Sequence, residues 1–178
     1  MKHTILRAAL LILTVAAGFL LQTNLGRWIP FLTVAPNLLL IITFSIGFLR
    51  GKTEGMLTGL LCGLLLDSLD GGVFGHYTLI LLYIGYLNGL LGRVFVNDMI
   101  FLPLILCAAA EFFYSLYSYL TGAFLFGHTN VGDYLRTIAL PELIETLIFA
   151  VLLYGILMAV VRRLQESEKE KEDLTKFA

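Results

Sequence analysis

The sequence predicts an all-α integral membrane protein with about six transmembrane helices and both termini in the cytoplasm. Hydrophobic residues make up 58% of the chain and charged residues 14%, and the mean hydropathy is +0.88. A soluble domain averages about 25% charged residues. In addition, 10 of the 25 charged residues lie in the last 17 of the 178 positions, so the rest of the chain is even more apolar. We therefore expect one membrane domain over residues 1–163 and a charged cytoplasmic tail over residues 164–178.

Six apolar runs give the predicted spans, at residues 5–25, 34–49, 56–69, 73–91, 99–120 and 138–161. The second and third runs are short, because as helices they reach only about 24 and 21 Å across a hydrocarbon core of about 30 Å. One continuous helix over 34–69 would bury Arg50, Lys52 and Glu54 at about 2.5 to 3.5 kcal/mol for each charge. We therefore expect a hairpin that places these charges in water. The first run lacks a small-residue cleavage site, so it is expected to be retained as a span.

The distribution of Lys and Arg predicts the orientation, because these residues collect on the cytoplasmic side of a membrane protein. The termini and alternate loops on one side contain Lys2, Arg7, Arg50, Lys52, Arg93, Arg162 and Arg163, whereas the other side contains Arg27 and Arg136. Both termini are therefore expected in the cytoplasm. The longest external loop, residues 121–137, is too short for a separate catalytic domain.

Small or acidic residues recur at every fourth position, at Gly51, Gly55, Gly59, Gly63, Asp67, Gly71 and Gly75. Only Gly55, Gly59 and Gly63 fall inside the third span, because the positive loop and the turn after Asp67 interrupt the series. Glycines four apart let a neighbouring membrane helix approach closely, and Gly85 and Gly89 offer a matching stripe in the fourth span. We expect these five glycines to pack helices within one subunit. The alternative is an interface with another membrane protein.

Two acidic residues lie inside or at the end of predicted spans. Asp67 is expected to bond backbone amides of the 68–72 turn, with a functional carboxylate as the alternative. Glu111 lies about midway along the fifth span, so its side chain should face the protein interior. Its candidate hydrogen-bond partners are Asn88, Tyr83 and Tyr86.

The start of the sixth span carries a proline and two glutamates. Pro141 suits the first turn of a helix, where its missing amide proton costs nothing. Glu142 and Glu145 are three apart and so share one helix face, where they would complement the positive end of the helix dipole. The alternative is a proton relay that also includes Glu111.

The motifs of several function classes are missing from the sequence. Cys62 and Cys107 lie in apolar runs without CxxC spacing, and His3, His76 and His128 are dispersed, so neither a metal nor a cofactor is expected. No GxSxG, Walker or HExxH motif occurs, so we expect no catalytic residues and no enzyme activity. A formal charge of −1 gives no basic surface for nucleic acid.

One set of residues suggests a family. Pro36 and Asn37 open the second span, a short hairpin carries Arg50, and Gly59 lies in the third span. The third span ends in Gly63-Leu64-Leu65-Leu66-Asp67, followed by Gly71, Gly72 and Gly75. With this pattern the chain resembles the MreD family of rod shape-determining proteins from its first span to its last. It departs from the pattern at Asn37, where such chains often have an acidic residue.

The resemblance implies a multi-pass protein of the bacterial cytoplasmic (inner) membrane, without enzyme activity, in the cell-elongation machinery or elongasome. It implies direct binding to the bitopic protein MreC and, through the complex, association with MreB, the glycan polymerase RodA and a transpeptidase. The family is also similar in fold to the substrate-binding subunits of energy-coupling-factor vitamin transporters. Membrane lipid is the remaining neighbour, and a homodimer stays open.

The fold similarity supplies the alternative function, a substrate-binding membrane subunit of a vitamin or small-molecule transporter. In that case Asp67, His76, Asn88 and Glu142 would line a pocket near the outer face.

Overall fold

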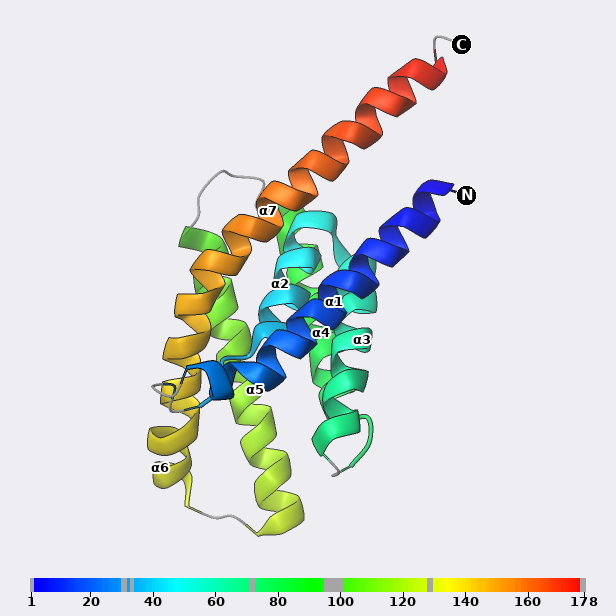
Figure 1. Ribbon diagram of the computed structural model, residues 1–178. Coiled ribbons are helices and arrows are strands. Elements are labelled where there is room, and N and C mark those ends of the chain that lie inside the picture. Colours follow the sequence, from blue (N-terminus) through cyan, green and yellow to red (C-terminus); the bar gives the residue numbers. More distant parts are fainter. Residues whose placement is uncertain are drawn as a thin grey trace.

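The computed structural model describes residues 2–29, 32, 34–70, 73–94, 101–127 and 130–176, and its regular structure within these ranges is helical (Figure 1). The elements are α1 (Lys2–Trp28), α2 (Leu38–Arg50), α3 (Lys52–Asp70), α4 (His76–Val94), α5 (Phe101–Phe126), α6 (Val131–Tyr134), the π-helical turn η1 (Leu135–Ala139) and α7 (Leu140–Lys176). Because α6, η1 and α7 follow one another without a break, the described residues form six continuous helices.

Three of these helices contain segments that are long and apolar enough to cross a membrane. The segments are Ala9–Trp28, Pro103–Gly122 and Val131–Val161. By contrast, α2 is apolar but has only 13 residues, or about 20 Å of helix. Several apolar helices in one chain indicate a multi-pass membrane protein.

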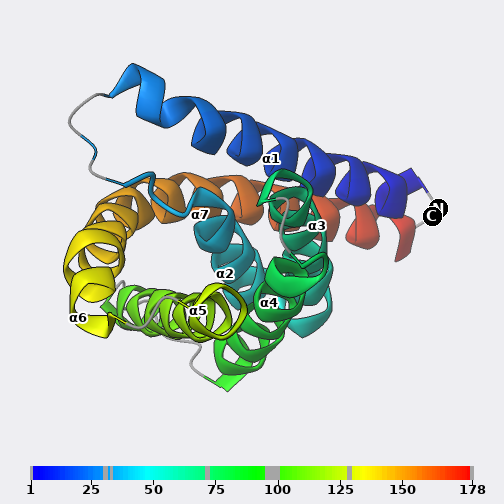
Figure 2. The ribbon, with the colours of Figure 1, turned by 90° about the horizontal axis from the view of Figure 1, so that it is seen from below.

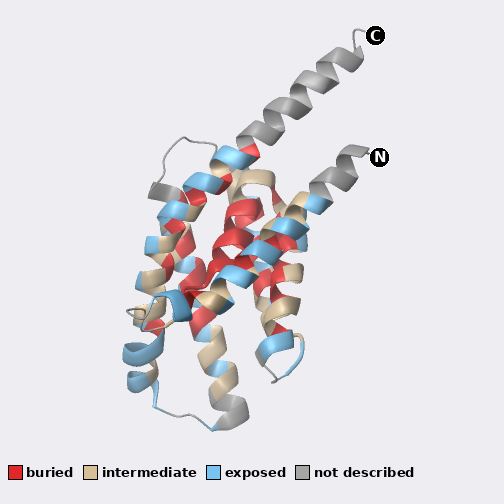
Figure 3. Ribbon diagram, in the orientation of Figure 1, coloured by how far each residue is buried: buried red, intermediate tan, exposed pale blue. Residues whose placement is uncertain are grey.

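The short helix α2 lies at the centre of the bundle (Figure 2). Every residue from Leu38 to Gly47 is buried, and the buried residues gather where the other helices meet this one (Figure 3). Phe44 illustrates the packing, since its ring lies 5.9 Å from that of Phe48 and 6.3 Å from that of Tyr154 in α7. A helix that is hydrophobic all round lies either in lipid or in the core of a protein, and the burial of α2 places it in the core. The remaining helices cover it.

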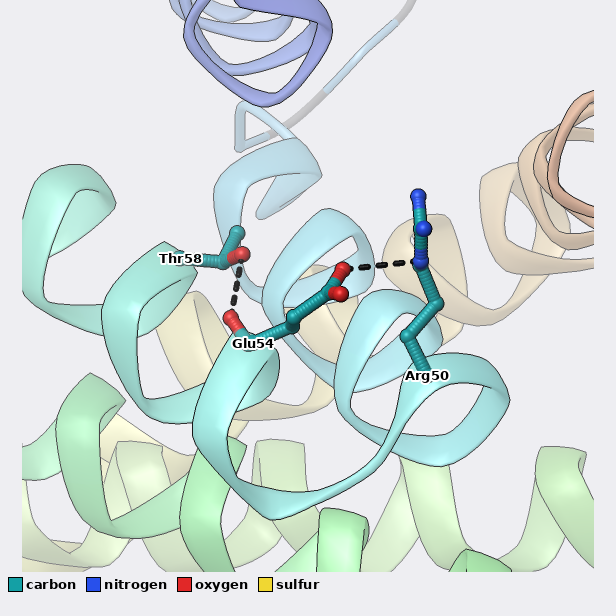
Figure 4. A network of polar contacts seen from close by, with 3 residues as sticks. All are labelled: Arg50, Glu54 and Thr58. Carbon is teal, nitrogen blue, oxygen red and sulfur yellow. Dashed lines mark hydrogen bonds and ion pairs between the residues drawn. The ribbon is translucent and has the colours of Figure 1, made fainter. Parts of the chain in front are cut away.

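The break between α2 and α3 falls at Gly51, which has a φ of 96°. This left-handed conformation suits glycine because it has no Cβ. Arg50 and Glu54 pair across the break, with 2.8 Å between Nε and Oε2, and the hydroxyl of Thr58 donates to the Glu54 carbonyl oxygen (Figure 4). The expectation that the hairpin places Arg50 in water is wrong, because its side chain is only 6% exposed. The ion pair compensates the buried guanidinium.

The last helix begins earlier than the sequence predicted. The predicted loop over 121–137 is helical at both ends, because α5 continues to Phe126 and helix resumes at Val131. Pro141 is the second residue of α7, but the chain before it is already helical. A proline inside a helix leaves the carbonyl oxygen four residues earlier without a donor, and the wide turn of η1 directly before α7 accommodates that change.

Candidate functional site

Three glycines of α3 lie directly against the backbone of α4. A Cβ atom placed on Gly55 would be 2.4 Å from the carbonyl oxygen of Gly85, and one on Gly59 would be 2.2 Å from that of Leu81. On Gly63 the added atom would lie 2.2 Å from the Cα of Thr78. These separations are shorter than any Cβ contact tolerates, so the two backbones touch along the length of this face. We call the contact the glycine seam.

The facing helix contributes glycines of its own to the glycine seam. An added Cβ on Gly85 would lie 2.1 Å from the Gly55 carbonyl oxygen, and one on Gly89 would lie 2.3 Å from the Cα of Lys52. The seam therefore runs from the α3–α4 hairpin to the α2–α3 break. Since this chain's own helices cover it, a partner protein has to contact another surface.

Sequence reasoning missed two glycines of the same contact. A Cβ on Gly47 of α2 would lie 2.7 Å from the carbonyl oxygen of Gly85, and one on Gly92 of α4 would lie 2.2 Å from that of Phe48. Gly47 precedes Gly51 by four residues, so extending the four-residue series backwards would have found it. The four-residue spacing does not, however, indicate that α2 packs against α4.

Asp67 joins the end of α3 to the start of α4. Its Oδ1 accepts a hydrogen bond from the Tyr77 amide at 2.9 Å, and its Oδ2 accepts from the Thr78 amide at 3.1 Å and from the Thr78 hydroxyl at 2.5 Å. These donors belong to the first turn of the next helix and not to the predicted 68–72 turn, of which Gly71 and Gly72 lie outside the described residues. A carboxylate here satisfies amides that have no partner within their own helix and complements the helix dipole.

The residue between the turn and α4 is Gly75, with a φ of 97°. Its left-handed backbone lets the chain reverse and enter the helix at His76. Gly71 and Gly72, which the sequence grouped with it, lie outside the described residues.

An aromatic cluster next to this cap links α4 to α5. The ring of His76 stacks on Tyr117 at 4.6 Å between centroids, and its Nε2 lies 3.2 Å from the Thr121 hydroxyl. Tyr77 in turn stacks on Tyr114 at 6.0 Å. The sequence marked His76 only as a possible pocket residue. Its ring contacts come from a helix about forty positions away, which local spacing does not indicate.

Pro36 and Asn37 form the buried N-terminus of α2. The Oδ1 of Asn37 accepts from the Leu40 amide at 3.1 Å, which makes Asn37 the N-cap. Asparagine caps as well as aspartate does, so the departure from the usual acidic residue preserves this role. Proline just before the cap fixes the backbone that leads into it.

Two polar residues that the sequence did not single out complete this buried terminus. Gln22 of α1 accepts the Leu39 amide proton through its Oε1 at 3.0 Å, and the Thr146 hydroxyl of α7 accepts from the Asn37 amide at 3.0 Å. Thr146 is fully buried. Hydrogen bonds thus tie α1, α2 and α7 together where α2 begins.

Glu111 is fully buried in α5, and neither of its carboxyl oxygens has a hydrogen-bond partner among the described residues. It interacts electrostatically with Glu142 of α7. The predicted partners Asn88, Tyr83 and Tyr86 are wrong. The Asn88 side chain donates to the Ile84 carbonyl oxygen of its own helix at 2.8 Å, and Tyr83 is 55% exposed.

Glu142 and Glu145 share one face of α7 and interact with each other. Since helix precedes them from Val131 onwards, they do not stand at a free helix N-terminus. Instead Glu142 lies within electrostatic reach of Glu111, Tyr114 and Tyr134. Of the described residues, no three His, Cys, Asp or Glu side chains gather closely enough to hold a metal ion.

Comparison with known proteins adds one finding. A family model described as rod shape-determining protein MreD matches residues 2–164. No curated protein matches the chain, and no solved structure does. The matched range contains the glycine seam, the Asp67 cap, the buried start of α2 and all three apolar segments of membrane-spanning length. The chain therefore belongs to the MreD family of rod shape-determining proteins.

Proposed function

We propose that the protein is a non-enzymatic membrane scaffold of the bacterial cell-elongation (rod) complex, which binds MreC and helps to organise peptidoglycan synthesis. The observation that carries this proposal is the family match over residues 2–164. Membership of the family implies a role in rod-shape determination. The binding to MreC goes beyond the match and rests on the properties of the family.

The way the polar groups are used supports a scaffold. Asp67 holds one helix end to another, the hydrogen bond between Asn37 and Thr146 joins α2 to α7, and Arg50 is paired with Glu54. Close glycine packing and capped helix ends give a bundle with a fixed shape. Such a bundle suits a protein that positions others.

The proposed topology places both termini in the cytoplasm, with residues 1–163 as the membrane domain and residues 164–178 as a cytoplasmic tail. The start of α1 and the end of α7 lie at the same end of the molecule, which supports termini on one side of the membrane (Figures 1 and 2). The excess of Lys and Arg at that end favours the cytoplasmic side of the inner membrane. Protease protection of a tag after Ala178 in sealed inverted vesicles would test this orientation.

In this proposal MreC is the direct partner, and MreB, RodA and a transpeptidase associate through the complex. A fold like that of energy-coupling-factor substrate-binding subunits remains a prediction, which a solved structure of this chain would test. The alternative of a transporter subunit has less support, because the side chains of Asp67 and Asn88 are already engaged in hydrogen bonds to the backbone of α4.

The test is co-expression with MreC from the same organism, followed by purification in a mild detergent. We expect a tag on either protein to retain the other, and depletion of this protein to convert rods into round cells. Failure of co-purification, together with rod-shaped depleted cells, would overturn the proposal. Tight binding of a vitamin by the purified protein would instead favour the transporter alternative.

A further inference from the structure

A long apolar groove runs between α5 and the helix formed by α6, η1 and α7. It contains one cavity of about 230 Å³ toward the α6 end and a second of about 290 Å³ farther along α7. The first cavity lies between Phe112 and Ser115 of α5 and Leu140 and Leu143 of α7, among others. The lining of the second consists of Leu104, Ile105, Ala108, Leu147 and Val151. We call the two together the α5–α7 groove.

The two cavities open along the same helix faces. On α5 the lining residues follow one another at spacings of three or four, as Leu104, Ala108, Phe112, Ser115 and Tyr119. On α7 the sequence of lining residues is Leu140, Leu143, Leu147 and Val151. Residues three and four apart form one stripe on a helix. The cavities are therefore parts of one continuous groove.

The length of the α5–α7 groove indicates what fills it. From Leu104 to Tyr119 it extends about 22 Å at about 1.5 Å per residue. Half of a hydrocarbon core measures about 15 Å, which is the depth available to a lipid chain in one leaflet. A groove that crosses the membrane midplane matches a membrane-spanning helix better than a lipid tail.

The α6 end of the groove extends this argument. The apolar segment Val131–Val161 has 31 residues, or about 46 Å of helix, and even a tilt of about 40° leaves it about 36 Å across a core of about 30 Å. Val131 and Leu135 line the groove at this end and are 49% and 42% exposed. Lipid tails do not reach apolar side chains beyond the hydrocarbon core. A protein partner would cover them.

The side chains in the lining that carry a hydroxyl are Ser115, Tyr119 and Tyr134. Ser115 is 5% exposed, and its hydroxyl has no hydrogen-bond partner among the described residues, although its carbonyl oxygen accepts from the Tyr134 hydroxyl at 3.2 Å. In a membrane, small residues such as serine let a neighbouring helix approach closely. The Ser115 oxygen is itself buried, so this residue offers an occupant of the groove a small contact and no exposed polar atom.

We propose that the α5–α7 groove binds one transmembrane helix of a partner protein, apolar along the face that enters the groove. This inference rests on the proposed function, in which the partner is the bitopic protein MreC. The inference adds the position of the partner's transmembrane helix, which lies in the α5–α7 groove. The docking surface is distinct from the glycine seam, because the chain's own helices cover the seam.

Two adjacent phenylalanines provide a matched test. Phe112 lines the groove, whereas Phe113 lines neither of its cavities, and the two side chains are 52% and 60% exposed. Each is replaced in turn by p-benzoylphenylalanine, and membranes that also contain MreC are irradiated. We expect the variant with the photoreactive residue at position 112 to form a covalent adduct with MreC. The variant with the same residue at position 113 should form none.

The other outcomes separate the inference from the function on which it rests. Equal adducts from both positions, or adducts mainly from position 113, would overturn the groove as the docking site. An adduct with a second copy of this chain, or with lipid alone while MreC still co-purifies, would also overturn it and leave the proposed function standing. If MreC fails to co-purify at all, the proposed function fails and the inference falls with it.

A second pair of variants tests the groove by filling it. Leu143→Trp places a larger side chain in the lining, whereas Leu152→Trp changes a residue of the same helix that is 63% exposed and outside the lining. We expect Leu143→Trp to lose co-purification with MreC and Leu152→Trp to retain it, while both variants elute as folded monodisperse protein. Retention of MreC by both would count against the groove.

Discussion

The carboxylate of Asp67 accepts hydrogen bonds from both the backbone amide and the hydroxyl of Thr78, across the hairpin between α3 and α4. The same two residues mark one end of the glycine seam, since Gly63 touches the Thr78 backbone. The cap and the seam therefore fix the same pair of helices, one by hydrogen bonds at the end and the other by backbone contact along the length.

Removing the cap should destabilise the bundle. Asp67→Ala leaves the amides of Tyr77 and Thr78 without an acceptor, and loss of an N-cap and its charge-assisted bonds costs about 1 to 3 kcal/mol. The matched control is Ser68→Ala, because Ser68 is exposed and bonds only to the Leu64 carbonyl oxygen of its own helix. Thermal unfolding in detergent should show a lower Tm for Asp67→Ala alone. Equal Tm values would show that the cap contributes little.

Adding a single methyl group to the glycine seam should be costly. Gly59→Ala puts a Cβ 2.2 Å from the Leu81 carbonyl oxygen, so the helices must separate, at about 1 to 3 kcal/mol. Gly155→Ala in α7 is the control, since nothing lies within 4 Å of its added Cβ and alanine favours a helix by up to about 1 kcal/mol. The two variants should shift the Tm in opposite directions. A tolerated Gly59→Ala would mean that α3 and α4 lie farther apart than in this structure.

The hydrogen bond between α7 and the start of α2 should be measurable on its own. Thr146→Val keeps the shape of the side chain but removes the acceptor of the Asn37 amide proton, at a cost of about 1 to 3 kcal/mol for the buried donor. Thr137→Val is the control, because Thr137 is exposed and its hydroxyl donates to the Asp133 carbonyl oxygen of its own helical segment. Unfolding curves should separate the two variants. An unchanged Tm in Thr146→Val would argue against this contact.

The buried glutamates should behave as a coupled pair. Glu111→Gln and Glu142→Gln each remove a group that can carry charge from a pair of interacting carboxyls, so each should raise the Tm or leave it unchanged. Because each substitution alters the same interaction between the two carboxyls, the two single effects should not add up in the double variant. Strict additivity in a double-mutant cycle would show that the two carboxyls do not interact.

Apolar runs were enough to predict an all-helical membrane protein and the approximate positions of its helices, because a chain in a bilayer must satisfy its backbone polar groups internally and apolar helices do so. The start of the last helix was placed too late. A proline normally indicates a helix start, and the π-helical turn that lets Pro141 follow existing helix has no pattern in the hydrophobic residues.

The partners of the polar residues were harder to predict. Asp67 was assigned to its nearest turn, but its donors lie ten and eleven positions away on the next helix. Glu111 was assigned partners in the fourth span, but its carboxyl oxygens have no hydrogen-bond partner among the described residues, and it interacts electrostatically with Glu142 of α7. Gln22 and Thr146 gave no signal at all, because a single polar residue in an apolar helix shows neither its direction nor its neighbour. These contacts depend on how the helices pack, which one sequence does not specify.

The cover around α2 has a consequence for how the protein is made. This helix of 13 residues is too short to cross the hydrocarbon core by itself. Two backbone amides at its start donate to Gln22, from before it, and to Thr146, from more than a hundred positions after it. A chain still emerging from the ribosome lacks Thr146 until the last helix is synthesised. Membrane insertion of this protein is therefore not a series of independently stable steps, and α2 reaches its final hydrogen bonding only when α7 arrives.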